Sequence, residues 1–327
     1  MHNEQQKTFS RPTLANRLLD SKQMIGLLLV AVAFYLISFF VSSTKFVSIL
    51  HISSFMALAA LGQTLVFLIA GIDLSVASLL SAAGILLCFF VDGNIPFGLS
   101  MLLVIVLSAL IGVLNGVGIS CLKIPPLVMT VAMQYILRGA TLVTTNGKPI
   151  AITTEGLRNW VNQDVIPGIS GGVLVMIICG AILTWILYKT KFGREIFFYG
   201  SSPRVSTMSG INTTKVTILV YTIAAAMTGL TGIMLVGYTG TAAVRIGDSY
   251  LLPSIAAVLL GGTSPLGGKG NVIRTMVGAF ILCNTVSLLT VMQMTEATRQ
   301  VIEGFIVLIF IVVNNTDLQR KKKTKHN

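Results

Sequence analysis

Asp73 is the residue whose type and setting most clearly suggest function, because it interrupts a long apolar stretch. The sequence G-I-D-L-S occupies residues 71–75, between the apolar runs 46–70 and 74–91. Gly71 can end one helix and Asp73 and Ser75 can cap the next, where the helix dipole stabilises an acid. The same pattern is typical of a broken membrane span whose polar junction lines a pathway, since irregular backbone is tolerated at depth only inside protein or beside water. Both interpretations can hold together.

Three further polar side chains, those of Asn115, Gln134 and Arg138, lie within apolar segments. Asn115 belongs to a Gly112-x-x-x-Gly116 stretch, and small residues at this spacing favour close packing of two helices. Its amide can bond a neighbouring helix, or a polar solute if it faces a pathway. Arg138, one helical turn after Gln134, either extends to the membrane interface or lines a polar cavity. The candidate pathway residues are therefore Asp73, Ser75, Asn115, Gln134 and Arg138.

The glycine-rich stretch 261–270 is the nearest approach to a nucleotide-binding motif. A phosphate loop requires G-x-x-x-x-G-K-[ST], but Thr263 stands at the first glycine and Gly270 at the hydroxyl residue that holds magnesium. A tight turn between two spans explains the stretch better. The histidines have no metal-ligand spacing, and serine, histidine and acidic residues do not cluster as in a hydrolytic triad. We therefore expect no catalytic centre, no metal site and no cofactor in this chain.

Charged residues are rare in this chain. It has 327 residues, of which 54% are hydrophobic and only 10% charged, whereas a soluble domain carries about 25% charged residues. This composition predicts an integral, all-α membrane protein. The formal net charge of +12 raises the question of a nucleic-acid partner, but the basic residues gather at the two ends and in a central segment, beside apolar runs. That distribution indicates topology determinants and contacts with anionic lipid headgroups, and no nucleic acid.

The central segment, residues 189–215, is the largest polar interruption of the apolar chain. An excess of Lys and Arg in a short connection marks the cytoplasmic side of a membrane. Pro203 can open a short helix and Gly210 can close it, so we expect one or two amphipathic turns lying across the membrane face. Against the single acid Glu195, the segment carries the basic residues Lys189, Lys191, Arg194, Arg204 and Lys215.

The apolar runs predict a polytopic bundle of about ten transmembrane helices with broken helices, since about 20 apolar residues cross a bilayer. An even number of spans puts both termini on one side, which the basic residues indicate to be cytoplasmic. The chain then divides into a cytoplasmic segment 1–23, a membrane domain 24–313 and a basic tail 314–327. The expected spans are Met24–Val41, Phe46–Ala70, Leu74–Val91, Leu99–Leu122, Leu127–Val143, Val173–Tyr188, Val216–Tyr238, Leu251–Leu260, Val272–Met292 and Gln300–Val313.

Two smaller features lie between and within these spans. Residues 146–172 are expected to form an external loop with an amphipathic piece around Trp160. Arg299 and Glu303, four residues apart, can pair on one face of the last span.

Taken in order, these stretches resemble the permease subunits of bacterial ATP-binding-cassette importers for sugars, in the ribose-type branch. The likeness covers roughly residues 24–313. Its elements are G-I-D-L-S at 71–75, K-I-P-P at 123–126, R-G at 138–139, T-N-G-K-P-I at 145–150, the central residues Gly193, Arg194, Tyr199, Gly200, Ser209, Gly210 and Ile211, and the stretches 255–264 and 267–270.

The resemblance implies a set of partners in a bacterial plasma membrane. A second permease subunit, identical or different, would complete the pore. A cytoplasmic ATPase would hold ATP and magnesium, and an extracytoplasmic binding protein would deliver the solute. The central segment would dock in a groove of the ATPase, through the candidate coupling residues Gly193, Arg194, Tyr199, Gly200, Pro203, Arg204, Ser209, Gly210 and Ile211.

The resemblance also implies a solute, a monosaccharide such as ribose or a related pentose or furanose. The stretches S-S-P-R-V-S-T-M at 201–208 and Y-L-L-P-S at 250–254 depart from the ribose-type pattern and are similar to those of relatives that serve a furanosyl quorum-sensing signal. That signal, or a nucleoside, is therefore an alternative. A stand-alone ion-coupled transporter is a second hypothesis, but such proteins place paired acids or histidine relays in their spans. Only Asp73 and Glu303 come close to that pattern.

Overall fold

A computed structural model describes residues 14–42, 46–151, 155–302, 304–305 and 308. Helices dominate these residues, and four short strands join them. The helices are α1 Leu14–Ser42, α2 Phe46–Leu68, α3 Val76–Asp92, α4 Phe97–Ser120, α5 Pro126–Thr145, α6 Glu155–Asn162, α7 Gly171–Lys189, α8 Lys191–Ser201, α9 Pro203–Met208, α10 Thr213–Thr239, α11 Asp248–Leu260 and α12 Val272–Val291; the strands are β1 Ile150–Ala151, β2 Asp164–Ile166, β3 Ile169–Ser170 and β4 Thr241–Ala242.

The helix boundaries follow local sequence signals. Asn212 and Asn271 cap α10 and α12, where their side chains accept hydrogen bonds from the backbone N–H groups of Lys215 (2.9 Å) and Arg274 (3.1 Å). Gly240 ends α10 in the left-handed conformation, with φ +74°, which costs glycine little. Short polar side chains and glycines thus divide the apolar chain into separate helices.

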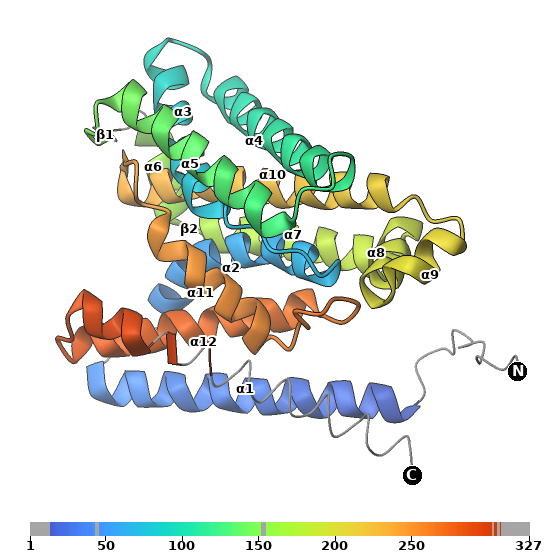
Figure 1. The fold of residues 1–327 in the computed structure, drawn as a ribbon. Coiled ribbons are helices and arrows are strands. Elements are labelled where there is room, and N and C mark those ends of the chain that lie inside the picture. The colour runs from blue at the N-terminus through green and yellow to red at the C-terminus, as the bar shows by residue number, and fades with distance from the viewer. Residues whose placement is uncertain (1–13, 43–45, 152–154, 303, 306–307, 309–327) are drawn as a thin grey trace, which may run out of the picture.

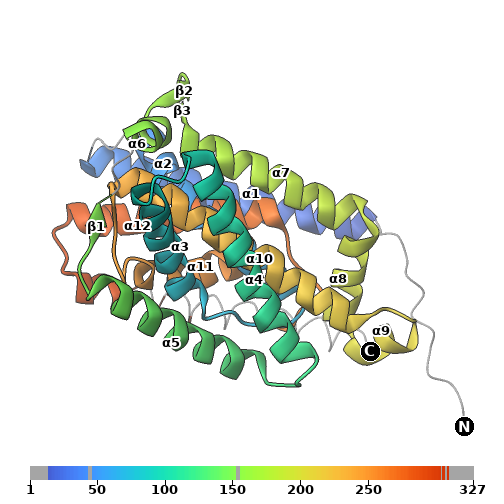
Figure 2. The same cartoon turned by 90° about the horizontal axis from the view of Figure 1, so that it is seen from above.

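Helices α2 and α10 form the centre of the bundle. In their most apolar stretches 83% and 67% of the residues are buried, against 22% for α4 and 17% for α5. Figures 1 and 2 show α4 and α5 on the outside, with α1 along the side where α12 lies. Since the outer helices are apolar and exposed, their faces suit contact with lipid or with another membrane subunit.

Six helices of the described residues are long and apolar enough to cross a membrane: α2, α4, α5, α7, α10 and α12. The all-α membrane architecture is therefore confirmed, whereas the expected number of about ten spans is not. Helix α11 has 13 residues, or about 20 Å at 1.5 Å per residue, which is too short for a hydrocarbon core of about 30 Å. Helix α3 and the apolar part of α1, Met24–Phe40, are also shorter. Most of the tenth expected span, Gln300–Val313, and the tail 314–327 lie outside the described residues.

The bundle has two distinct ends (Figure 1). Helices α8 and α9 mark one of them, called here the α8 end. The other, the α6 end, carries α6 and two antiparallel strand pairs, β1 with β4 and β2 with β3. The amphipathic piece expected around Trp160 is confirmed as α6. Because β4 pairs with β1 at the α6 end, the non-helical residues 243–247 lead from that end to the start of α11.

The central segment is more helical than expected. One or two turns were predicted within residues 189–215, but α8 alone has 11 residues and α9 adds 6. Helix α8 was not predicted from the sequence, because it contains Gly193 and Gly200 and glycine disfavours a helix interior. Helix α1 likewise begins at Leu14, before the expected span Met24–Val41.

Candidate functional site

Helix α8 is joined to α7 by a very tight turn. The Thr190 side chain caps α8 by accepting a hydrogen bond from the Gly193 N–H (3.2 Å). A Cβ on Gly193 would collide with the backbone carbonyls of Ile186 and Leu187. Arg194, one residue on, is exposed. Gly193 therefore fixes the direction of α8, and Arg194 is free to face a partner.

The other end of α8 is wedged against two membrane helices. The Thr217 hydroxyl on α10 donates to the Tyr199 hydroxyl (3.4 Å). A Cβ on Gly200 would overlap the Leu68 carbonyl at the end of α2 and would lie 2.5 Å from the Gly268 nitrogen. Gly268 itself donates its N–H to that carbonyl (2.9 Å). We call Leu68, Gly200, Gly267 and Gly268 the glycine junction, since backbone meets backbone there with no side chain between.

Helix α9 begins and ends as its sequence predicts. Pro203 occupies its first turn, and Gly210 follows its end in the left-handed conformation, with φ +77°. The Ile211 N–H donates to the Ser206 carbonyl (3.0 Å) and the Gly210 N–H to the Thr207 carbonyl (3.1 Å), which is the Schellman pattern. Ser209, Gly210 and Ile211 therefore have an evident structural role, the termination of α9.

The outer surface of α8 and α9 combines basic and apolar side chains. Val205 is 50% exposed and Met208 83% exposed, although both are apolar and lie in a polar segment. Arg204 on α9 and Arg194 on α8 are also exposed. We call Arg194, Arg204, Val205 and Met208 the coupling face. Exposed apolar groups on a surface that also carries charge are typical of a protein-binding surface.

Asp73 and Ser75 lie inside the bundle, in the break between α2 and α3. The Asp73 Oδ1 accepts hydrogen bonds from the Ser75 backbone N–H (2.9 Å) and hydroxyl (2.6 Å). Asn115 on α4 donates its amide to the Ser75 Oγ (3.1 Å), and Gln63 on α2 donates to the Asp73 carbonyl (2.6 Å). We call these four residues the Asp73 cluster; Gln63 was not expected in it, and its only sequence signal is an amide inside an apolar run.

The Asp73 cluster is enclosed by close helix packing. All four of its side chains are buried. A Cβ on Gly116 of α4 would lie 2.6 Å from the Ile218 Cα of α10, so the small-residue motif brings these helices together as predicted. In the break itself, the Tyr221 hydroxyl of α10 donates to the Ile72 carbonyl (3.3 Å). Helices α2, α3, α4 and α10 thus meet around one set of hydrogen bonds.

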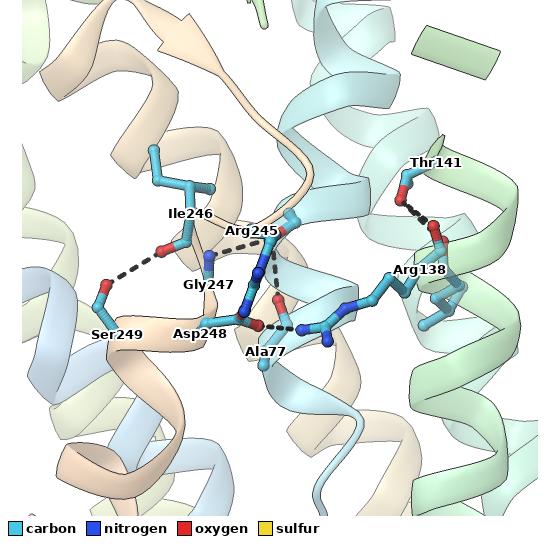
Figure 3. Close-up of polar contacts among 10 residues, drawn as sticks. Ala77, Arg138, Thr141, Arg245, Ile246, Gly247, Asp248 and Ser249 are labelled. Carbon is cyan, nitrogen blue, oxygen red and sulfur yellow. Dashed lines mark hydrogen bonds and ion pairs between the residues drawn. The ribbon is translucent and has the colours of Figure 1, made fainter. Parts of the chain in front are cut away.

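Arg138 lies in a second polar group, nearer the α6 end. Its guanidinium pairs with the Asp248 Oδ1, and the Arg245 Nε pairs with the Asp248 Oδ2 at 2.9 Å (Figure 3). Asp248 is the first residue of α11, and sequence reasoning missed it; its signal was an acid just before an apolar half-helix. Gln134, although one turn from Arg138, is half-buried and shares no hydrogen bond with either group among the described residues.

The structure therefore divides the candidate pathway residues. Asp73, Ser75 and Asn115 come together, Arg138 belongs to a separate ion-pair group, and Gln134 joins neither. The pairing expected for Arg299 concerned Glu303, which lies outside the described residues. Among the described residues, Arg299 pairs with Glu296 (2.8 Å). In the part of the chain that the structure describes, no group of three or more His, Cys, Asp or Glu residues could hold a metal ion.

The fold is that of a polytopic membrane protein. It is a bundle of apolar helices with a broken span between α2 and α3, and the basic segment that contains α8 and α9 lies at one end. The sequence model described as "Branched-chain amino acid transport system / permease component" matches residues 45–312. Because this match spans most of the chain, the protein belongs to that family of transport-system permeases. It is thus a multi-pass membrane component of a transporter.

Several curated proteins are similar to the chain over most of its length. The ribose import permease RbsC of Escherichia coli K12 is 33% identical over 302 residues, covering 91% of this chain and 94% of the relative. RbsC of Haemophilus influenzae is 31% identical over 307 residues, with the same coverage. The autoinducer 2 import permease LsrD of Escherichia coli SMS-3-5 is 28% identical over 276 residues, covering 81% of this chain and 82% of the relative. No solved structure matches the chain.

Proposed function

We propose that this chain is the membrane-spanning permease subunit of an ATP-binding-cassette importer and forms the translocation pathway for a monosaccharide. Ribose, or a related pentose or furanose, is the proposed solute. The observation that carries this proposal is the 33% identity to a ribose import permease over nearly the full length of both chains.

A furanosyl quorum-sensing signal is the second candidate solute. The 28% identity to an autoinducer 2 import permease supports it, as do the Ser-Pro-Arg-Val stretch at 202–205 and the Leu-x-Pro stretch at 251–253. Both solutes are small and rich in hydroxyl groups, so the same pathway chemistry suits either. The proposed importer, with its permease, ATPase and binding protein, is the same for either solute.

The Asp73 cluster is proposed to form part of the pathway wall. Asp73 Oδ2, Gln63 Oε1 and Asn115 Oδ1 are buried and have no hydrogen-bond partner among the described residues. Buried acceptors of this kind favour water or a hydroxyl donor. A sugar needs such weak, distributed contacts, because a solute held tightly at one point would not leave it.

The coupling face is proposed to dock in a groove of a cytoplasmic ATPase, which would hold the ATP and magnesium. Its apolar centre of Val205 and Met208 supplies buried area, and Arg194 and Arg204 supply charge at the rim. The glycine junction would carry motion inward, since Gly200 touches the end of α2 and the turn before α12 directly. Packed backbones with no side chain between them transmit rigid-body movement.

The α8 end is proposed to face the cytoplasm of a bacterial cell. Basic side chains gather there, on the α4–α5 connection, on α7 to α10 and on the α11–α12 turn, as the positive-inside rule requires. Both termini would lie on that side, and a solute-binding protein would dock on the α6 end. A second permease subunit, another copy of this chain or a different one, would face the exposed outer helices, with lipid around both.

Uptake of a panel of radiolabelled solutes into proteoliposomes tests the proposal. The vesicles hold this chain, its ATPase and its binding protein, and are offered ribose, the furanosyl signal and a nucleoside. ATP-dependent accumulation of ribose is the expected result. Preference for the furanosyl signal would keep the importer and change its solute, whereas accumulation of none of the three would overturn the assignment.

A further inference from the structure

A groove of about 590 Å³ opens in the half of the bundle away from the glycine junction. Its walls are the first part of α2, the start of α11, the second half of α12 and residues 296–300. Since α2 ends and α12 begins at the α8 end, these parts all lie toward the α6 end. The volume is within the range of small-molecule sites, about 300–1,000 Å³. No residue named so far in the candidate pathway lines it.

Asp248 stands at the edge of this groove as a fixed acceptor. It lines the groove, and its two carboxylate oxygens each pair with one arginine, from α5 and from the segment before α11 (Figure 3). About 30% of its side chain stays accessible. An ionised carboxylate has about four acceptor positions, so two ion pairs leave it able to accept from a ligand hydroxyl. Arg138 and Arg245 orient the carboxylate without closing it off.

The start of α11 is held rigidly in place. The Gly247 N–H donates to the Ser81 hydroxyl on α3 (3.0 Å), and a Cβ on Gly247 would collide with the Ala77 carbonyl. The Ser249 hydroxyl donates to the Ile246 carbonyl (3.1 Å) (Figure 3). A precise acceptor on a braced helix end is what a selective site requires. Non-helical backbone beside a half-helix inside a membrane protein is also a frequent place for a solute site.

The rest of the groove is chemically suited to a neutral polyol. Ser48, Ser287 and Thr290 place hydroxyls along walls that are otherwise mainly apolar. Glu296 and Arg299 at one side are paired with each other (2.8 Å), and Arg299 also donates to Thr290 (2.7 Å). Since each acid in the groove has a basic partner, no isolated charge selects an ion. With Ser249 of α11, hydroxyls lie on three walls of the groove, formed by α2, α11 and α12, and they fit a sugar better than an acyl chain.

We propose that this groove, with Asp248 as its charged acceptor, is a solute subsite in the extracytoplasmic half of the pathway and takes a neutral, polyhydroxylated ligand of monosaccharide size. The inference rests on the proposed function and adds a place and a chemistry for solute contact. Asp248 is a binding residue in it, and Arg138 and Arg245 position the carboxylate.

Cysteine protection tests the subsite without depending on transport. Cys88, Cys121, Cys179 and Cys283 are replaced by alanine, and Ser287→Cys is introduced as the reporter in right-side-out vesicles that hold the complete transporter. A membrane-impermeant thiol reagent should modify this cysteine, and ribose should slow the reaction at least threefold, while an equal concentration of a neutral, non-sugar osmolyte should not. Lys148→Cys, at an exposed position near the α6 end and outside the groove, is the matched control, where ribose should change nothing.

Two variants link the protection to the named groups. Asp248→Asn in the Ser287→Cys background should raise the ribose concentration for half-protection about tenfold, since a hydrogen bond to a charged group is lost. Thr290→Val, which leaves the ion pairs at Asp248 intact, should raise it by a smaller factor. If Asp248→Asn prevents assembly, Thr290→Val alone still tests whether ribose binds in the groove. An unchanged ribose concentration for half-protection in Thr290→Val would overturn the groove as the binding surface.

The remaining outcomes separate the subsite from the proposed function. Ribose uptake by the unmodified assembly without ribose protection of Ser287→Cys would overturn the subsite and keep the importer. Modification by an apolar maleimide but not by the impermeant reagent would show a lipid-filled groove and would also overturn it. Absence of uptake of ribose, the furanosyl signal and the nucleoside, together with absence of protection by any of them, would overturn both.

Discussion

At the scale of single residues, two kinds of contact dominate this protein. Glycines let backbones touch where the central segment meets the membrane helices, and Gly200 is the clearest case. Buried polar side chains hold the break between α2 and α3, where Asp73 accepts two hydrogen bonds from Ser75. A single added methyl group would disrupt the backbone contact at Gly200, and removal of the Asp73 carboxylate would remove the hydrogen bonds in the break. Each kind of contact can therefore be tested by one substitution.

Gly200→Ala should destabilise the permease, because its Cβ would meet backbone atoms of Leu68 and Gly268 that cannot rotate away. Overpacking of this kind costs about 1–3 kcal/mol, and the midpoint of thermal unfolding in detergent should fall accordingly. Gly98→Ala on α4 is the matched control, since nothing lies within 4 Å of its new Cβ. Equal midpoints for the two variants would contradict the close approach at the glycine junction.

Asp73→Ala should destabilise the protein more than Asp73→Asn. Alanine leaves the buried N–H and hydroxyl of Ser75 without their acceptor, which costs about 1–3 kcal/mol, whereas asparagine keeps an oxygen at the Oδ1 position. The measurement is again the thermal midpoint of the purified protein. A midpoint for Asp73→Asn as low as that for Asp73→Ala would show that the carboxylate charge, and not the hydrogen bonding, holds the break.

Sequence patterns predict parts of these sites and miss others for physical reasons. Asp73, Ser75 and Asn115 stand out because they interrupt apolar runs, and the structure does bring them together. Asp248 does not stand out, because acids are common in the first turn of a helix, and only the fold brings Arg138 to it. The contact of Gly200 with Gly268 is also invisible in sequence, since each glycine alone suggests an ordinary turn.

At the scale of elements, the helix boundaries explain which predictions hold. The long apolar runs became α2, α4, α5, α7, α10 and α12. Helix α11 is half a span, because the residues before it are held in extended and turn conformations by β1 and α3. Apolar content gives the length of a run but not the tertiary contacts that end a helix inside it, so the number of spans was the weakest part of the prediction.

Helix α9 should carry the contact with the ATPase. The double variant Arg204→Glu and Met208→Asp replaces one basic and one apolar side chain of the coupling face, both exposed, so the permease should fold normally. Co-purification of the ATPase should fall at least tenfold, because an apolar centre and a rim charge are lost together. Lys148→Glu, an exposed basic residue near the α6 end, is the control. Undiminished co-purification by the double variant would show that the ATPase binds elsewhere.

At the scale of the whole molecule, the two ends differ in charge and in structure. Basic residues are concentrated in the segments at the α8 end, while the α6 end carries the strand pairs (Figure 1) and the groove beside α11. This polarity fits a protein that meets an energy source on one side of a membrane and a solute on the other. The half-helix α11 connects the α6 end to the α8 end. It begins with Asp248 at the groove and is followed by the turn at Gly267 and Gly268 in the glycine junction.

The native thiol of Cys121 provides a direct test of orientation. It is exposed at the end of α4, next to Lys123 at the α8 end. In a variant with the other three cysteines changed to alanine, an impermeant thiol reagent should label Cys121 in inverted membrane vesicles and not in intact cells. A second variant, Lys148→Cys with Cys121 also removed, should show the opposite pattern. Labelling of Cys121 from outside would reverse the proposed topology.

The most direct test of the central claim is the ATP dependence of ribose uptake by the reconstituted system. Proteoliposomes with this chain, its ATPase and its binding protein should accumulate ribose only with ATP. The Arg204→Glu and Met208→Asp variant, although inserted and folded, should accumulate almost none. Uptake by this chain alone, without ATP and unchanged by that variant, would contradict the account and identify a secondary transporter instead.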